Sequence, residues 1–261
     1  MATLPHWLLP PRKTKQPRLL SRAKSRDLRI KTVRRFLHAL MLGRNDMGKE
    51  ETMDKMTELM QRYPQLECCK AQIENAMDLL RKMYADGGKL LACGNGGSCA
   101  DCEHIVGELM KSFLIHRPIT QQLKASLEEK FPEDAEKFYQ CMQRGIPAIS
   151  LPSQTAVLSA YVNDVDPEFF YAQLVQGYGA AGDVVLCIST SGNSKNVVRA
   201  AQMAKALGLK TLALTGMKDS KLSMLCDVTV QVPETETFKI QELHLPVYHY
   251  LCAQLEEELF G

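Results

Sequence analysis

Five short apolar runs, each followed by turn residues and then a helical stretch, constrain the fold of this chain more than any other feature. The runs cover residues 89–93, 147–151, 183–188, 210–214 and 228–232. Strands that are apolar throughout are buried on both faces, and their alternation with helices is typical of a parallel sheet. The sequence therefore predicts an α/β fold with a doubly wound, five-stranded parallel sheet sandwiched by helices.

The sequence also predicts helices in two regions outside this alternation. Apolar side chains at helical spacing predict one long helix over residues 54–84, ended by the turn from Asp86 to Gly88. Residues 114–145 interrupt the strand–helix rhythm with two polar helical segments, which Phe131 and Pro132 separate. We interpret this stretch as a helical insertion on the surface of a domain that spans residues 53–261.

The first 52 residues form a separate, basic N-terminal extension. Residues 1–50 carry 13 Lys or Arg but only 3 Asp or Glu. Because the net charge of the whole chain is only +2, the residues after position 50 carry a net negative charge. The extension is predicted to be disordered or partly helical. Three interpretations are open: it binds nucleic acid or an anionic surface, it is an amphipathic targeting peptide, or it is an unstructured leader. The last is favoured, and a nucleic-acid partner is not expected.

The sequence favours a cytoplasmic location. It contains no apolar run of about 18 residues or more, so no membrane partner is expected. Leu8 and Leu9 are followed at once by Pro10, which does not fit a secretory signal. The nine cysteines, which include the adjacent Cys68 and Cys69, do not have the spacing of a disulfide scaffold and fit a reducing compartment.

Two turns at strand ends stand out as candidate ligand sites. Residues 93–98 form a glycine-rich turn in which Asn95 and Ser98 offer polar side chains at a helix start. Its spacing differs from GxGxxG, so a nicotinamide cofactor is not expected. Residues 189–194 place four hydroxyls between an apolar strand and a helix, which is either a phosphate cradle or a heavily bonded helix cap. Without a Gly-Lys-Ser/Thr sequence, it fits a phosphorylated small molecule better than ATP, and no nucleotide cofactor is predicted.

Two pairs of polar residues share helix faces. His104 and Glu108 are four residues apart on the helix that leaves the first turn, so they can converge on one ligand. Gln241 and His249 are eight residues apart on the last helix and again share a face, with His244 close by. Taken singly, each of these side chains fits a solvated or capped position equally well.

The motifs GNGGSxAD, HxxxE, ND, STSGNS and IQExH occur in this order along the chain. With them, the sequence resembles the phosphoheptose isomerases of the SIS (sugar isomerase) domain family over roughly residues 54–259. The resemblance implies a flavodoxin-like fold and a homotetramer. It also implies isomerisation of sedoheptulose 7-phosphate to D-glycero-D-manno-heptose 7-phosphate through an enediol.

The resemblance also assigns roles to residues. The implied phosphate ligands are Ser189, Thr190, Ser191 and Ser194. The implied sugar-binding residues are Asn95, Gly96, Gly97, Glu108, Asn163, Asp164 and Gln241. The implied ligands of one zinc ion per subunit are His104, Glu108, Gln241 and His249. Because an aldose–ketose isomerisation needs a base at carbon and an acid at oxygen, Glu108 is assigned as the base and His249 as the acid.

Two positions depart from the family's pattern. After the Glu-Leu pair the family usually has Gly-Arg, whereas Met110-Lys111-Ser112 follows here. Lys111 keeps the charge of the arginine without the fork of a guanidinium. Pro246 lies inside the last helix, where it is expected to remove a hydrogen bond and introduce a kink. The rival interpretation is a non-catalytic SIS protein that senses a phosphosugar or binds a protein partner, as the replication-initiator-associating relatives do. The presence of both HxxxE and QExH favours catalysis.

Overall fold

The computed structural model describes residues 53–261, so the predictions for the N-terminal extension lie outside the described residues. Its sheet has the strand order β2-β1-β3-β4-β5, and every neighbouring pair is parallel. This is the order of the flavodoxin-like doubly wound folds. The predicted fold and all five predicted strands are confirmed: β1 (Leu90–Gly94), β2 (Ala148–Ser150), β3 (Val184–Ile188), β4 (Lys210–Gly216) and β5 (Val228–Val232).

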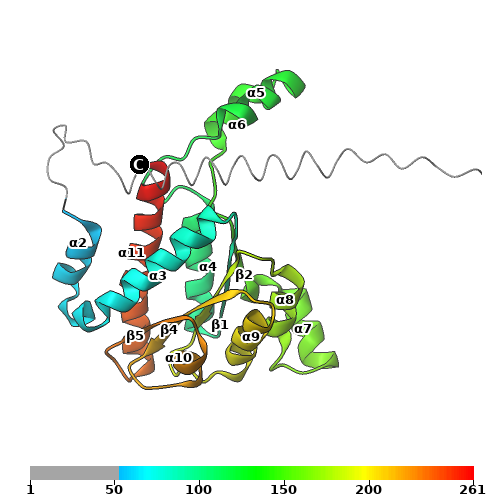
Figure 1. Cartoon of the computed structure of the whole chain (residues 1–261). Coiled ribbons are helices and arrows are strands. Elements are labelled where there is room, and N and C mark those ends of the chain that lie inside the picture. The colour runs from blue at the N-terminus through cyan, green and yellow to red at the C-terminus, as the bar shows by residue number, and fades with distance from the viewer. Residues whose placement is uncertain (1–52) are drawn as a thin grey trace, which may run out of the picture. The chain divides into compact units, whose positions relative to one another are not determined.

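Helices cover both faces of the sheet (Figure 1). On one face lie α2 (Lys55–Arg62), α3 (Lys70–Ala85), α4 (Gly97–Met110) and α11 (Thr237–Phe260). On the other lie α7 (Thr155–Asp164), α8 (Phe170–Tyr178), α9 (Lys195–Ala206) and the short α10 (Lys221–Leu225). Short 3₁₀ turns span Pro64–Cys69 and Leu151–Ser153.

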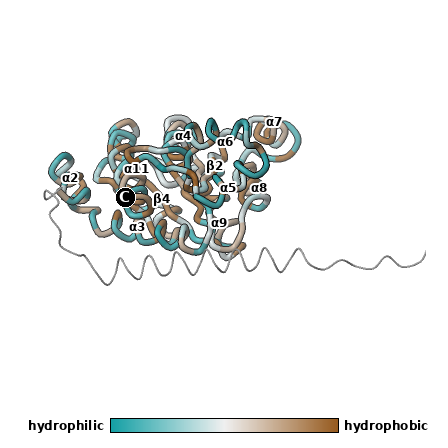
Figure 2. Tube along the Cα trace, turned by 90° about the horizontal axis from the view of Figure 1, so that it is seen from above, coloured by the Kyte–Doolittle hydropathy of each residue, from teal (hydrophilic) through white to brown (hydrophobic). Residues whose placement is uncertain are grey.

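The alternation of side chains along the strands separates two apolar layers. In β1, Leu90 and Ala92 pack under α3, α4 and α11, whereas Leu91 and Cys93 pack under α8 and α9. Successive side chains of a strand point to opposite faces, so a run that is apolar at every position fills both layers. Figure 2 shows the brown, hydrophobic segments concentrated between the helices.

The prediction of one long helix over residues 54–84 is wrong. The segment consists of α2, a 3₁₀ turn and α3. Pro64 causes the break, because proline lacks an N–H and disfavours the helical conformation of the residue before it. Tyr63 accordingly has φ −134° and ψ 68°. The predicted end of the helix is confirmed at Gly87, which has a φ of +75°.

The two helices predicted within residues 114–145 are present as α5 (Gln121–Lys130) and α6 (Ala135–Cys141). They connect at Phe131 and Pro132, as expected, and α5 contributes no buried residue. The last helix, α11, continues as a single element through Pro246. Among the described residues, no helix is both long enough and apolar enough to cross a bilayer.

Candidate active site

The two polar turns lie side by side at the carboxyl edge of the sheet, because they follow the paired strands β1 and β3. Asn95 of the first turn and Asn196, which lies in α9 just after the second turn, form two hydrogen bonds across this edge. Asn95 Nδ2 donates to Asn196 Oδ1 at 2.9 Å, and Asn196 Nδ2 donates to Asn95 Oδ1 at 2.9 Å. In doubly wound sheets ligands bind at this edge, where the first helix turns present free N–H groups. The predicted ligand turns are therefore brought together.

In the serine-rich turn, the N-cap side chain does not cap the helix that follows. Ser194 is the N-cap residue of α9, but its hydroxyl contacts Ser189 Oγ at 3.0 Å rather than an N–H of the helix. The first N–H groups of α9 and its positive dipole end thus face the turn. Gly192 has a φ of +63°, and a Cβ on it would lie 2.1 Å from Ser220 Oγ. The tight turn therefore needs glycine.

Gln241 meets the first turn from α11. A Cβ built on Gly97 would lie 2.3 Å from Gln241 Nε2, so the amide occupies the space that a side chain would fill. The structure therefore places Gln241 at the start of α4, beside the sugar-binding turn predicted from Asn95 to Gly97. It does not place this amide with the two histidines, which lie about two helical turns further on.

His104, Glu108 and His249 form a cluster where α4 and α11 lie against each other. His104 Nε2 is 3.3 Å from Glu108 Oε1 and 3.3 Å from His249 Nε2. The predicted convergence of the HxxxE pair and its meeting with His249 are thus present. Within residues 53–261, no three His, Cys, Asp or Glu side chains are grouped as a preformed metal site.

Burial sets the electrostatics of this cluster. Desolvation lowers the pKa of His249 below its usual value, and the neighbouring His104 lowers it further. The His249 imidazole is therefore neutral near pH 7 and can donate an N–H. Glu108 Oε2 is buried and has no hydrogen-bond partner among the described residues, with Lys111 Nζ 4.0 Å away. This oxygen is free to accept a proton.

Two residues that the sequence analysis did not assign complete the cluster. The Tyr248 hydroxyl lies 3.1 Å from His104 Nδ1 and donates to Asp101 Oδ1 at 3.2 Å. A neutral His104 then carries its proton on Nδ1 and turns the lone pair of Nε2 toward Glu108 and His249. Burial raises the pKa of Asp101. Two signals for Asp101 were present in the sequence: it is the last residue of the GNGGSxAD motif, and it precedes His104 by three residues on one helix face.

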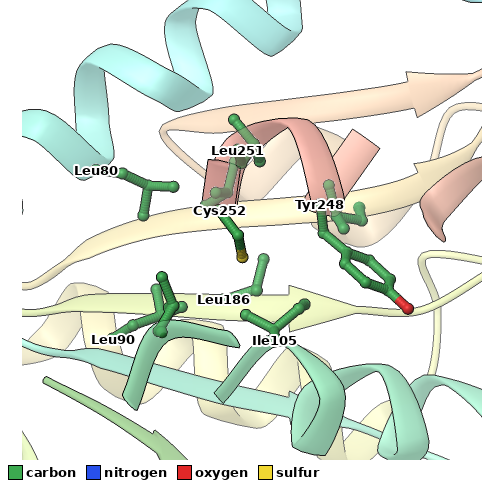
Figure 3. A pocket seen from close by; sticks show the side chains of 10 residues that line it. Leu80, Leu90, Ile105, Leu186, Tyr248, Leu251 and Cys252 are labelled. Atoms are coloured by element: carbon green, nitrogen blue, oxygen red, sulfur yellow. The ribbon is translucent and has the colours of Figure 1, made fainter. Parts of the chain in front are cut away.

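A small cavity lies beneath the cluster, between α3, α4, α11 and the sheet (Figure 3). Its volume is about 20 Å³, and only apolar or weakly polar side chains line it, including Leu80, Leu186 and Cys252. Figure 3 shows the Tyr248 hydroxyl pointing away from this lining. An apolar space of this size offers a water molecule no partners, so it is a packing gap and not a ligand site.

Three residues named from the sequence lie elsewhere. Asn163 and Asp164 end α7, which lies across the unit from α11 in both views, and Asn163 Nδ2 donates to Asp164 Oδ1 at 2.7 Å (Figures 1 and 2). The structure therefore does not bring this pair to the histidine cluster. His244 is fully buried with Nε2 3.4 Å from the Thr215 carbonyl oxygen, so it belongs to the core.

Known proteins resemble this chain in sequence and fold. SIS domain family models match residues 53–140 and 169–254. The phosphoheptose isomerase of Crocosphaera subtropica is 38% identical over 193 residues, which cover 74% of this chain and 85% of the relative. The chain belongs to the phosphoheptose isomerase family of SIS-domain proteins.

Further members and solved structures agree with this family assignment. Phosphoheptose isomerase 2 of Campylobacter jejuni is 38% identical over 189 residues, covering 72% of this chain and 81% of that protein. The structure of phosphoheptose isomerase GmhA from Neisseria gonorrhoeae matches with a TM-score of 0.55 and 30% identity, covering 76% of this chain and 92% of the other. A phosphoheptose isomerase from Francisella tularensis, at a TM-score of 0.57 and 24% identity, shares the fold.

Proposed function

We propose that this chain is a phosphosugar aldose–ketose isomerase that converts sedoheptulose 7-phosphate to D-glycero-D-manno-heptose 7-phosphate. The meeting of Glu108 with His104 and His249 carries the proposal. A protein that only binds a phosphosugar needs the serine turn but has no use for a carboxylate and an imidazole set against each other. Membership of the phosphoheptose isomerase family supports the choice of substrate.

The proposed reaction moves one proton between neighbouring carbons and needs no external oxidant or reductant. The Glu108 carboxylate takes the proton from C1 of the ketose, and the released electron pair forms the C1=C2 double bond. His249 donates a proton to the C2 oxygen, which gives the enediol. His249 then takes the proton of the C1 hydroxyl as the C1=O bond forms, and Glu108 returns its proton to C2. A neutral imidazole suits both proton transfers.

The spacing of the site along α4 supports a long-chain sugar. The glycine-rich turn lies at the start of α4, beside the serine turn at the start of α9. His104 follows Gly97 by seven residues, which is about 10 Å of helix axis at 1.5 Å per residue. Gln241, beside Gly97, precedes His249 by eight residues, which is about 12 Å along the α11 axis. Because His249 in turn contacts His104, the two helices run in the same direction. A sugar held by its phosphate at the turns must extend along both helices to present C1 and C2 to Glu108.

We further propose that zinc binds at the histidine cluster. Neighbouring ligands of a tetrahedral zinc with bonds of 2.0–2.1 Å lie about 3.4 Å apart, close to the two 3.3 Å separations at His104 Nε2. The His104 Nε2 lone pair also faces the Glu108 carboxylate, a repulsive contact that a cation relieves. His104, Glu108 and His249 would hold the ion, and Gln241 would join them only by leaving Gly97. Bound zinc would polarise the substrate carbonyl.

The zinc proposal has a test that does not depend on activity. Isothermal titration should give one zinc ion per subunit for the wild-type chain and none for His104→Gln. Zinc binding that survives this substitution unchanged would exclude the cluster as the metal site.

We also propose a homotetramer in the cytoplasm. A groove of about 480 Å³ opens between α2 and α11 beside His249. Exposed apolar side chains border the site, namely Met110, Leu114 and Leu245. A second subunit packed on this side would bury them. All nine cysteines lie in the described residues as free thiols, which fits a reducing compartment. Light scattering on the purified chain tests the tetramer.

The decisive experiment is turnover of sedoheptulose 7-phosphate by the wild-type chain beside Glu108→Gln. Glu103→Gln is the matched control, because this exposed carboxylate lies on the same helix and bonds to Ser153 Oγ at 2.9 Å, away from the cluster. Loss of turnover in Glu108→Gln alone supports the isomerase. Saturable binding of the sugar phosphate without turnover by the wild-type chain would instead indicate a phosphosugar sensor.

A further inference from the structure

A buried ion pair lies at the end of α4, outside the chemistry assigned to the cluster. Arg117 and Glu256 are both fully buried, and Arg117 Nε donates to Glu256 Oε1 at 2.6 Å. Removing two charges from water costs several kcal/mol per ion, so such a pair is weak evidence for a stabilising role. The other partners of the two side chains indicate what the pair does.

Arg117 caps the helix that carries the proposed base. Its Nη1 donates to the carbonyl oxygen of Leu109 at 2.7 Å, and its Nη2 donates to that of Glu108 at 3.0 Å. The last carbonyls of a helix lack partners within the helix, and a cation at this end also interacts favourably with the helix dipole. Because α4 ends at Met110, this guanidinium fixes the backbone of Glu108 itself.

Glu256 connects this cap to the helix that carries the proposed acid. It follows His249 by seven residues on α11, so the two side chains lie on the same face two turns apart. Besides Arg117, its carboxylate accepts three backbone N–H groups, at 2.6 to 3.1 Å, from Phe113, Leu114 and Ile115. The ion pair therefore joins the end of α4, the segment after it and α11 into one unit.

We propose that Arg117 and Glu256 are positioning residues for the isomerisation, because they tie the backbone of Glu108 to the helix of His249. The inference rests on the proposed function. The 3.3 Å contact between His104 and His249 crosses from α4 to α11, and it depends on how these helices are spaced. A misplacement of about 1 Å in a catalytic group can lower the rate about 100-fold.

The chain contains a matched control pair. Arg81 on α3 donates through Nε to Glu258 Oε2 at 2.7 Å and through Nη2 to Glu258 Oε1 at 2.5 Å. This pair also ends on α11, but it binds the carboxylate through two hydrogen bonds, joins α3 to α11 and makes no hydrogen bond to α4 among the described residues. A general loss of α11 packing would affect both pairs alike.

The test compares Arg117→Lys with Arg81→Lys in the full chain, by steady-state turnover of sedoheptulose 7-phosphate and by thermal unfolding. A lysine cannot reach the carboxylate and both carbonyls at once. We expect kcat of Arg117→Lys to fall about 10- to 100-fold with KM nearly unchanged, and kcat of Arg81→Lys to stay within about twofold. A folded Arg117→Lys chain with wild-type kcat would overturn the proposal.

A second variant separates positioning from stability. The double substitution Arg117→Met with Glu256→Gln removes both buried charges, and the glutamine amide oxygen can still accept backbone N–H groups of residues 113–115. It still removes both carbonyl bonds, so we expect the same loss of kcat at an unfolding temperature close to that of the wild type. If neither variant folds, or if kcat falls only in step with the unfolding temperature, the pair serves folding and the proposal is wrong.

An NMR measurement distinguishes failure of this proposal from failure of the isomerase proposal. The imidazole signals of His104 and His249, assigned with His104→Gln and His249→Gln, should shift in Arg117→Lys and remain in place in Arg81→Lys. This result supports positioning even if the wild-type chain shows no turnover of the sugar. Unshifted signals in Arg117→Lys would overturn it.

Discussion

A substitution at His244 tests whether this residue of α11 belongs to the hydrophobic core or to the active site. It lies between Gln241 and His249 in the sequence, yet it is fully buried and its Nδ1 has no partner among the described residues. Burial lowers the pKa of His244 to about 4 from an ordinary value of 6.5. The side chain is thus a neutral core residue, and replacing it with methionine should leave kcat at pH 7.5 unchanged.

The lowered pKa predicts how stability depends on pH. Above pH 6.5 neither the folded nor the unfolded state protonates this histidine, and the full stability is present. Below pH 6.5 the unfolded state binds the proton and the folded state does not, so stability falls until the pH reaches about 4. Between pH 7.5 and 4.5 the wild-type chain should lose about 2.5 kcal/mol through this group, from 1.36 kcal/mol per pH unit.

The assay is thermal and urea unfolding of wild-type and His244→Met chains at both pH values and one protein concentration. The variant should lose about 2.5 kcal/mol less than the wild type on acidification, which corresponds to about 5–10 °C of Tm for a domain of this size. Other titrating groups cancel in this difference. Parallel pH dependences of the two chains would refute the buried, neutral state of His244, and loss of turnover at pH 7.5 would place it in the active site.

Three further predictions concern the site itself. In Tyr248→Phe, loss of the hydroxyl that orients His104 should lower kcat about tenfold at unchanged KM, as steady-state kinetics will show. In Gly192→Ala, the new Cβ must displace Ser220, so KM for the sugar phosphate should rise about tenfold or more in the same assay. In His104→Gln, desolvation of His249 remains but the additional lowering of its pKa by His104 is lost. The acidic limb of residual kcat/KM, measured with a chelator present, should therefore move to higher pH.

Each of these predictions has a result that contradicts it. An unchanged kcat in Tyr248→Phe would mean that the histidine needs no hydroxyl to orient it. A wild-type KM in Gly192→Ala would place the phosphate outside the serine turn. An acidic limb that stays in place, or moves to lower pH, would show that it does not report His249.

The strands and the ligand turns could be predicted because their signals are local. A run such as residues 183–188 is apolar at every position, and only a strand buried on both faces uses such a run in this context. The helix break at Pro64 was also present in the sequence, but the apolar spacing on both sides of it suggested continuity. In the structure, the missing N–H and the restricted Tyr63 decided against a continuous helix.

The types and spacing of the chemical groups were determined by the sequence alone. It placed His104 and Glu108 on one helix face and four hydroxyls in one turn, since helical periodicity and turn chemistry act over a few residues. Only the tertiary structure decided which groups meet. His104 and His249 are in contact although 145 residues separate them along the sequence. The sequence separation is 147 residues for Tyr248 and Asp101 and 139 for Arg117 and Glu256. Such meetings depend on how α4 and α11 pack on the sheet, which no local pattern specifies.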